Sequence, residues 1–239
     1  MNMKRFGKTG ALVSELCLGT MTFGWQTDED AAMKIMTKFA EEKGNFIDTA
    51  GIPLYKYIGD TKGSAEVGVS IGMDELESMK ERARDAVKKG YKRIKVKIRK
   101  GMEEKIVSSV RSTIGEYPMS VDANTDYTLD DTDSLKALDK YNLKYIEQPL
   151  SYDDLIDHSY LASKISTPIC LDESITSFDK ARKAISINAC KVINIKPGRV
   201  AGFTESLKIA KYSHDHGIHV WIGGMLETGI GRAFNVSLA

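Results

Sequence analysis

The sequence of 239 residues contains no long apolar run and no excess charge of either sign. No stretch approaches the ~20 consecutive apolar residues that a membrane-spanning helix requires. The first ten residues, MNMKRFGKTG, lack the apolar core of a secretory signal peptide. The 34 basic and 33 acidic residues give a formal net charge of +1, so neither nucleic acid nor an anionic membrane is expected as a partner.

Cysteine is also scarce. Cys17, Cys170 and Cys190 are widely separated and lie in apolar segments. An odd number of cysteines at this spacing favours buried free thiols over a disulfide or a metal-binding pair. Because no pattern indicates export, membrane insertion or disulfide formation, we expect a cytoplasmic protein.

Short apolar segments alternate with longer amphipathic segments from residue 67 onward. Strands that alternate with helices of this length indicate an α/β fold with a parallel sheet, and the chain length fits a TIM-type (β/α)8 barrel. This region supplies seven strands, one fewer than a closed barrel needs. The predicted strands cover 67–72, 93–98, 119–124, 145–150, 169–174, 192–198 and 219–226. The predicted helices cover 73–90, 103–114, 130–140, 153–165, 177–189, 201–217 and 229–239.

Residues 1–50 have a different pattern. MKRFGKTGALVSEL predicts a small β-hairpin that turns near residues 8–10. Residues 17–21 and 45–50 are candidate strands, and residues 28–44 predict an amphipathic helix with acidic residues in its first turn. Either strand could close the barrel, which would leave the other strand outside it.

Five charged residues recur at intervals of 24 or 25 residues, each within one of the predicted strands: Lys97, Asp122, Glu147, Asp172 and Lys196. The carboxyl ends of barrel strands meet at one rim, so we expect these side chains to share a site. Any single acid could instead cap the next helix or pair with a lysine. Three carboxylates in register would repel one another unless a cation lay between them. Such a set suits Mg²⁺, with Mn²⁺ as an alternative.

The lysines beside these acids suggest proton transfer. Lys95 and Lys97 are two residues apart on one strand, so their side chains point the same way. Lys196 should lie across the barrel mouth from Lys97. This arrangement suits removal of a proton alpha to a carboxylate, with one lysine on each side of the carbon. The charge of Lys95 would favour the neutral form of Lys97 that a base requires. For a lone Lys-x-Lys pair, a solvated edge strand is the alternative.

Further polar and glycine residues complete the predicted site. Glu173 directly follows a predicted ligand and should point away from the rim. The glycine-rich segment GGMLETGIG could let a substrate approach backbone amides at a helix start, although packing alone could also explain it. The predicted substrate-binding residues are Asn124, Ser174, Gly223, Gly224 and Met225.

The segments RIKVKI, SVDAN, YIEQPL, ICLDES, INIKPGRVAG and GGMLETGIGR together resemble the enolase superfamily over about residues 52–239. The resemblance is strongest to the branch of o-succinylbenzoate synthase and N-acylamino acid racemase. It implies that Asp122, Glu147 and Asp172 are Mg²⁺ ligands. It also implies that Lys97 is the general acid/base and that Lys196 acts from across the site. The implied activity is that of a lyase or an isomerase acting on a small carboxylate substrate.

The first 50 residues instead resemble the start of an aldo-keto reductase. Asp48 matches the aspartate of that family's catalytic site, but Pro53 stands where its tyrosine is expected, and Tyr55 is out of register. The late strands that bind NADPH are missing, so neither NADPH nor aldo-keto reduction is expected.

We therefore predict a chimera joined near residue 51, of designed or recombined origin, that forms a single barrel domain over residues 1–239. The enolase-like part lacks the capping domain that its family carries. The alternative to an enzyme is a non-catalytic chimeric scaffold that keeps these residues without turnover.

Overall fold

The computed structural model describes residues 2–5, 12–16, 18–19, 28–45, 47–48 and 64–239. The chain divides into two compact units, Met1–Gly63 and Ser64–Ala239. The predicted junction near residue 51 and Tyr55 lie outside the described residues, and the single barrel domain stays a prediction. Within the described ranges, no helix has the length and apolar character needed to cross a membrane.

The second unit is built on a parallel sheet in which neighbours in space are also neighbours in the chain. The order is β11-β10-β9-β8-β7-β6-β5, and every adjacent pair is parallel. All seven predicted strands are present, although each is shorter than predicted. They are β5 (Gly68–Ile71), β6 (Arg93–Lys97), β7 (Met119–Asp122), β8 (Ile146–Glu147), β9 (Ile169–Leu171), β10 (Val192–Ile195) and β11 (His219–Ile222).

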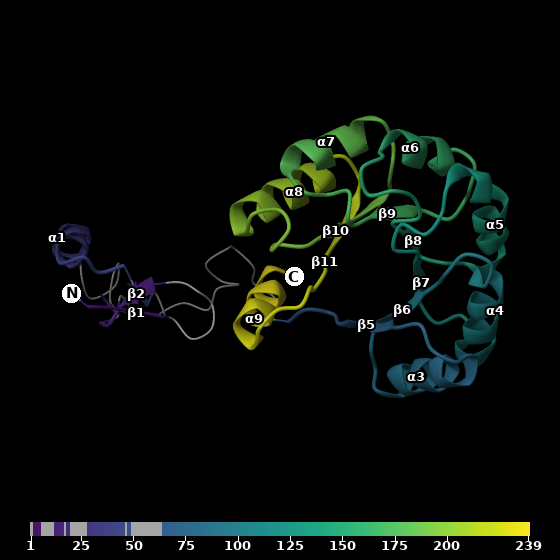
Figure 1. Ribbon diagram of the computed structural model, residues 1–239, viewed down its shortest axis with the longest axis horizontal. Coiled ribbons are helices and arrows are strands. Elements are labelled where there is room, and N and C mark those ends of the chain that lie inside the picture. The colour runs from purple at the N-terminus through teal and green to yellow at the C-terminus, as the bar shows by residue number, and fades with distance from the viewer. Residues whose placement is uncertain (1, 6–11, 17, 20–27, 46, 49–63) are drawn as a thin grey trace. The chain divides into compact units, whose positions relative to one another are not determined.

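A helix follows each strand. Six of them lie in an arc along the outer side of the curved sheet (Figure 1): α3 (Leu76–Lys88), α4 (Glu103–Ile114), α5 (Thr132–Lys136), α6 (Ile156–Ala162), α7 (Phe178–Ser186) and α8 (Phe203–Asp215). The seventh, α9 (Gly229–Leu238), lies apart from this arc. The single helix predicted over 130–140 is instead a short α5 between two 3₁₀ turns, Leu129–Asp131 and Ala137–Tyr141. Its sequence begins with Asp and Thr residues, which are weak helix formers in a helix interior.

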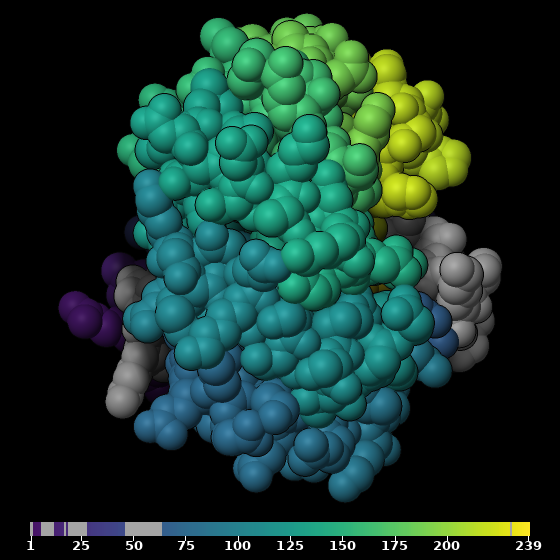
Figure 2. All heavy atoms as spheres, turned by 90° about the vertical axis from the view of Figure 1, so that its right-hand side faces the viewer, coloured from purple at the N-terminus to yellow at the C-terminus, as the bar shows by residue number. Residues whose placement is uncertain are grey.

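Side-chain alternation along the strands separates an apolar outer face from a polar inner face. On β6, Ile94 and Val96 are fully buried in the large core between the sheet and its helices. The intervening Lys95 therefore points to the inner side of the sheet. A smaller apolar cluster lies on that inner side, formed by Tyr145, Cys170 and Val192. Figure 2 shows the opposite, outer face, where side chains from α3 onward form a continuous surface.

The edges of this sheet are β5 and β11, so the described strands form an open, curved sheet of seven. The parallel α/β architecture is confirmed, whereas a closed eight-stranded barrel stays a prediction. The predicted buried thiols are confirmed at Cys170 and Cys190, which are both free. Cys17 lies outside the described residues.

The first unit contains the predicted hairpin and a βαβ segment. β1 (Met3–Arg5) pairs antiparallel with β2 (Leu12–Ser14), while the turn at residues 8–10 lies outside the described residues. β3 (Leu18–Gly19) pairs in parallel with β4 (Ile47–Asp48), on either side of α1 (Glu29–Glu41). Asp28 caps α1 by accepting a hydrogen bond from the N–H of Ala31 at 2.8 Å. In this unit β3 and β4 pair with each other. Closure of the larger sheet by one of these strands stays a prediction.

Candidate active site

The five charged residues of the sequence pattern all lie at the carboxyl ends of strands in the second unit. Lys97, Asp122 and Glu147 are the last residues of β6, β7 and β8, and they are level with one another in the sheet register. Asp172 directly follows β9, and Lys196 directly follows β10. The parallel sheet therefore places these side chains along one rim.

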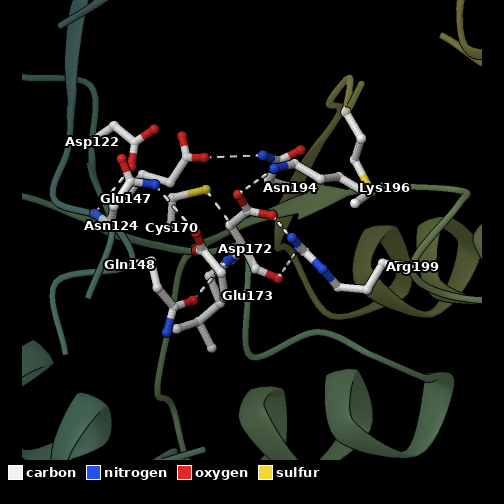
Figure 3. A network of polar contacts seen from close by, with 12 residues as sticks. Asp122, Asn124, Glu147, Gln148, Cys170, Asp172, Glu173, Asn194, Lys196 and Arg199 are labelled. Atoms are coloured by element: carbon white, nitrogen blue, oxygen red, sulfur yellow. Dashed lines mark hydrogen bonds and ion pairs between the residues drawn. The ribbon is translucent and has the colours of Figure 1, made fainter. Parts of the chain in front are cut away.

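The three carboxylates are almost fully buried, with residue exposures of 3% for Asp122, 0% for Glu147 and 1% for Asp172. Buried negative charges at neighbouring positions are strongly unfavourable without compensation. Figure 3 shows how the carboxylates lie beside the amide and basic side chains of the same rim.

Lys95 compensates the first two carboxylates. Its Nζ lies 2.8 Å from both carboxylate oxygens of Glu147 and 2.9 Å from Oδ2 of Asp122. Burial lowers the pKa of Lys95, but the charges of Glu147 and Asp122 outweigh this effect and raise the pKa above its ordinary value. These contacts therefore favour the charged form of Lys95, which also lies 5.2 Å from the centre of the Trp221 ring.

Two further cations hold Asp172. Nζ of Lys196 lies 2.7 Å from Oδ2 of Asp172. The guanidinium of Arg199 donates to Oδ1 of Asp172 and, at 2.8 Å, to its backbone carbonyl. Arg199 was not among the predicted site residues. Its position three residues after Lys196 could have indicated a role in the site. In the structure the backbone N–H of Arg199 donates to the carbonyl of Lys196 at 2.8 Å.

Asn194 is a second residue that the sequence interpretation missed. Its Nδ2 donates to Oε1 of Glu147 at 3.0 Å, and the residue is 1% exposed. Asn194 is two residues before Lys196, so strand alternation could have placed both on one face. Burial raises the pKa of Glu147, and Asp122 and Asp172 add to this increase, while Lys95 opposes it.

Lys97 belongs to a row of hydrogen-bonded side chains that meets the carboxylates at Asn124, whose backbone N–H donates to Oδ1 of Asp122 at 3.2 Å. Its Nζ donates to Oδ1 of Asn124, and Nδ2 of Asn124 donates to Oε1 of Glu173 at 3.2 Å. The expectation that Glu173 points away from the rim is therefore wrong. The backbone turns at Asn124, which has a left-handed φ of +43°. This turn places the Asn124 side-chain amide between Lys97 and Glu173.

The other predicted substrate-binding residues have different environments. Ser174 is buried, and its hydroxyl accepts a hydrogen bond from Gln148 Nε2 at 2.7 Å, so it does not face open space. Gly223 is buried against Asn194. Gly224 and Met225 are exposed.

A cavity of about 450 Å³ lies on the inner side of the sheet. Its lining includes Lys95, Asn194 and Lys196, together with Trp221 and Met225. The cavity therefore reaches the same basic side chains that contact the carboxylates. The three carboxylates and Lys97 are not part of its lining.

The donor chemistry of the rim fits a magnesium ion. Asp122, Glu147 and Asp172 supply hard carboxylate oxygens from three consecutive strands, the ligand type that Mg²⁺ prefers. As the side chains stand, no three His, Cys, Asp or Glu residues of the described part of the chain are grouped to hold an ion. Each carboxylate is paired with Lys95, Lys196 or Arg199 instead. The predicted metal site stays a prediction.

Comparison with known proteins places these residues in a family. A family model described as enolase C-terminal domain-like matches residues 78–239. An o-succinylbenzoate synthase from Bacillus subtilis is 48% identical over 189 residues, which cover 79% of this chain and 51% of that protein. An N-succinylamino acid racemase from Thermus thermophilus is 45% identical over 190 residues, which cover 79% and 52%. The chain spans about half the length of these relatives.

Solved structures give the same result. An enolase superfamily member from Listeria innocua superposes with a TM-score of 0.74 at 43% identity, over 77% of this chain and 50% of that one. A dipeptide epimerase from Cytophaga hutchinsonii, in complex with Mg and the dipeptide D-Ala-L-Val, gives a TM-score of 0.74 at 27% identity, over 79% and 53%.

Proposed function

Because this chain belongs to the enolase superfamily, in the branch of o-succinylbenzoate synthases and N-succinylamino acid racemases, we propose that it removes a proton alpha to a carboxylate. The observation that carries the proposal is the rim itself. Lys97 and Lys196 stand at strand ends on either side of three buried carboxylates. A chimeric origin with an aldo-keto reductase segment remains a separate prediction.

In this proposal the two lysines have opposite roles at the substrate carbon. Lys97, in its neutral form, accepts the proton on one side. Lys196 faces the other side, where it returns a proton in racemisation or stabilises the developing negative charge in dehydration. Asn124 orients Lys97 through the hydrogen bond between their side chains.

Asp122, Glu147 and Asp172 would hold Mg²⁺, or Mn²⁺ in its place. When bound, this cation supplies positive charge where the substrate carboxylate gains electron density. Lys196 and Arg199 would then share Asp172 with the cation, and Lys95 would continue to balance the charge of Glu147 and Asp122. The substrate is a small N-acyl amino acid or a related carboxylate.

A non-catalytic scaffold is the second candidate, and two observations favour it. All three carboxylates already have basic partners within the chain, so the rim is electrically balanced without metal or substrate. The sheet edges β5 and β11 also lack a further strand between them in the described residues. Water that enters an open site weakens the electrostatic interactions on which proton abstraction depends.

Proton exchange separates the two candidates. The protein is incubated with MgCl₂ and an N-succinyl amino acid in D₂O, and loss of the α-proton signal is followed by NMR. The enzyme proposal predicts exchange that disappears in Lys97→Ala and after chelation of the metal, and persists in Lys92→Ala, an exposed lysine ahead of β6. Exchange no faster in the parent chain than in Lys97→Ala would establish the scaffold.

A further inference from the structure

We propose that Gln148 is a positioning residue for the candidate metal site, and that its side-chain amide sets the placement of Asp172 relative to Glu147. This inference rests on the proposed function, because it assumes that these carboxylates hold a cation. Gln148 follows Glu147 at the end of β8 and is fully buried. Its φ of +39° is a left-handed conformation that is uncommon for a residue with a side chain. Such a conformation persists only where the surrounding contacts enforce it.

The side-chain amide of Gln148 connects β8 to the end of β9 (Figure 3). Its Oε1 accepts hydrogen bonds from the backbone N–H of Asp172 at 3.0 Å and of Ser174 at 3.2 Å. Its Nε2 donates to Oγ of Ser174 at 2.7 Å and to the carbonyls of Leu150 and Ser151 at 3.3 and 3.4 Å. One of the two N–H groups that Oε1 accepts from is that of Asp172, which carries one of the three carboxylates.

The backbone of Gln148 extends this connection to a third strand end. Its N–H donates to the carbonyl of Cys170 at 2.8 Å, and its carbonyl accepts from the N–H of Thr125 at 2.8 Å. One residue therefore links the segments that end β7, β8 and β9, the three strands that carry the carboxylates. The side-chain partners of Gln148 are backbone groups and one hydroxyl. Its effect on a metal ion would be indirect, through the position of the chain.

A glutamine suits this position because the site needs both a hydrogen-bond acceptor and a donor, and the glutamine side chain carries both at its end. Leucine supplies neither group. Asparagine supplies both but is shorter by one methylene, so its carbonyl withdraws from the two N–H groups. Ser151→Ala provides a control, since Ser151 is exposed and Gln148 contacts only its backbone carbonyl, so all hydrogen bonds of the Gln148 side chain stay in place. Gln148→Leu and Gln148→Asn then test the acceptor.

The test uses the full chain and three measurements on each variant. Mn²⁺ affinity is measured by the loss of the free-ion EPR signal, amide exchange at Asp172 and Ser174 by NMR, and stability by urea unfolding. We expect Gln148→Leu to weaken Mn²⁺ binding by about 10- to 100-fold, the range found when groups that orient metal ligands are removed. We expect Gln148→Asn to weaken it less, with faster amide exchange at both positions in each variant. Ser151→Ala should stay within about threefold of the parent, as expected for an exposed substitution.

The outcomes distinguish positioning from folding. If Gln148→Leu lowers stability while Mn²⁺ affinity stays within threefold of the parent, Gln148 is only a folding residue and the proposal falls. If Gln148→Leu does not fold, Gln148→Asn decides by the same criterion. If the parent chain binds no Mn²⁺, the proposed function fails first. Gln148 is then judged by amide exchange alone: faster exchange in the asparagine variant supports positioning, and unchanged exchange overturns it.

Discussion

Gly223 packs directly against the side-chain amide of Asn194. A Cβ atom at Gly223 would stand 2.8 Å from both Cγ and Nδ2 of Asn194, and closer still to its Oδ1. The same amide donates to the Glu147 carboxylate at 3.0 Å. The absence of a side chain at Gly223 is therefore a condition for the contact between Asn194 and Glu147.

Replacement of Gly223 by alanine should change the surroundings of Glu147 indirectly, through Asn194. The added methyl group must push Asn194 aside, which we expect to lower the free energy of unfolding by about 1–3 kcal/mol. Loss of the hydrogen bond to Glu147 should also weaken Mn²⁺ binding, measured by calorimetry. Gly224→Ala is the control, because the nearest atom to a Cβ there is Oε2 of Glu227 at 3.4 Å. Equal effects of the two substitutions would contradict this role for Asn194.

Among the described residues, Lys95 is the one cation that contacts two of the buried carboxylates, and its loss should be costly. Lys95→Met would leave Glu147 and Asp122 without their cation, and breaking a buried ion pair in this way destabilises a protein by about 3–5 kcal/mol. If these carboxylates bind Mg²⁺, the ion should restore part of the loss.

Urea unfolding with and without MgCl₂ measures this recovery. The control is Lys92→Met, whose side chain is exposed. A magnesium effect of the same size in both variants would show that the ion does not replace Lys95 at the carboxylates.

The sequence predicted the rim but not the contacts within it. Alternation of Val96 with Lys95 and Lys97 placed the lysines on the inner face, because a strand points successive side chains to opposite sides. The 25-residue spacing placed Asp122 and Glu147 level in the sheet, as the register confirms. These are local regularities, and a single sequence contains them.

Contacts made by loops and long side chains were not predictable in this way. Asn124 reaches Glu173 because its own left-handed backbone turns the chain beyond β7, and Arg199 reaches Asp172 from the loop after β10. The side chain of Gln148 accepts a hydrogen bond from the N–H of Asp172, just beyond β9. This contact depends on the left-handed backbone of Gln148, which the sequence does not indicate. Each case depends on where the backbone turns after a strand, and strand periodicity carries no information about that turn.

His158 should make stability depend on pH near neutrality. The side chain is fully buried, its Nε2 accepts from the N–H of Leu150 at 3.2 Å, and its Nδ1 donates to the carbonyl of Asp154. Burial lowers the pKa of His158 below its ordinary value of 6.5. The unfolded chain therefore takes up a proton first as pH falls. Stability should be greatest above about pH 6.5 and should decline from there down to the pKa of the folded state.

The variant His158→Phe tests this dependence by urea unfolding between pH 8 and pH 5. It should be less stable at pH 8 by about 1–3 kcal/mol, because the N–H of Leu150 and the carbonyl of Asp154 lose their partner. Its stability should also change less with pH than that of the parent. Parallel pH profiles for the two proteins would mean that His158 does not cause the decline.

Asp139 anchors the start of β9 and should contribute stability that, like that of the buried His158, is lost on acidification, but at lower pH. Its carboxylate accepts from the N–H groups of Ser166 at 2.8 Å and Thr167 at 2.7 Å, and from the Thr167 hydroxyl at 2.6 Å. Burial raises the pKa of Asp139, but these three donors outweigh it, so the net pKa is below the ordinary 3.8. The unfolded chain is then protonated first on acidification. The contribution should be complete above about pH 4 and lost as pH falls through the lower pKa of the folded state.

Asp139→Asn should therefore lower the free energy of unfolding at pH 7 by about 1 kcal/mol, a value at the low end for charged hydrogen bonds because the carboxylate is partly solvated. The difference from the parent should begin to shrink below about pH 4, where the carboxyl group of the unfolded parent takes up a proton before that of the folded protein. Chemical unfolding at pH 7 and pH 3 measures both values, with Asp133→Asn on the exposed side of α5 as the control. A difference that persists unchanged at pH 3 would mean that the charge of Asp139 is not what holds the loop before β9.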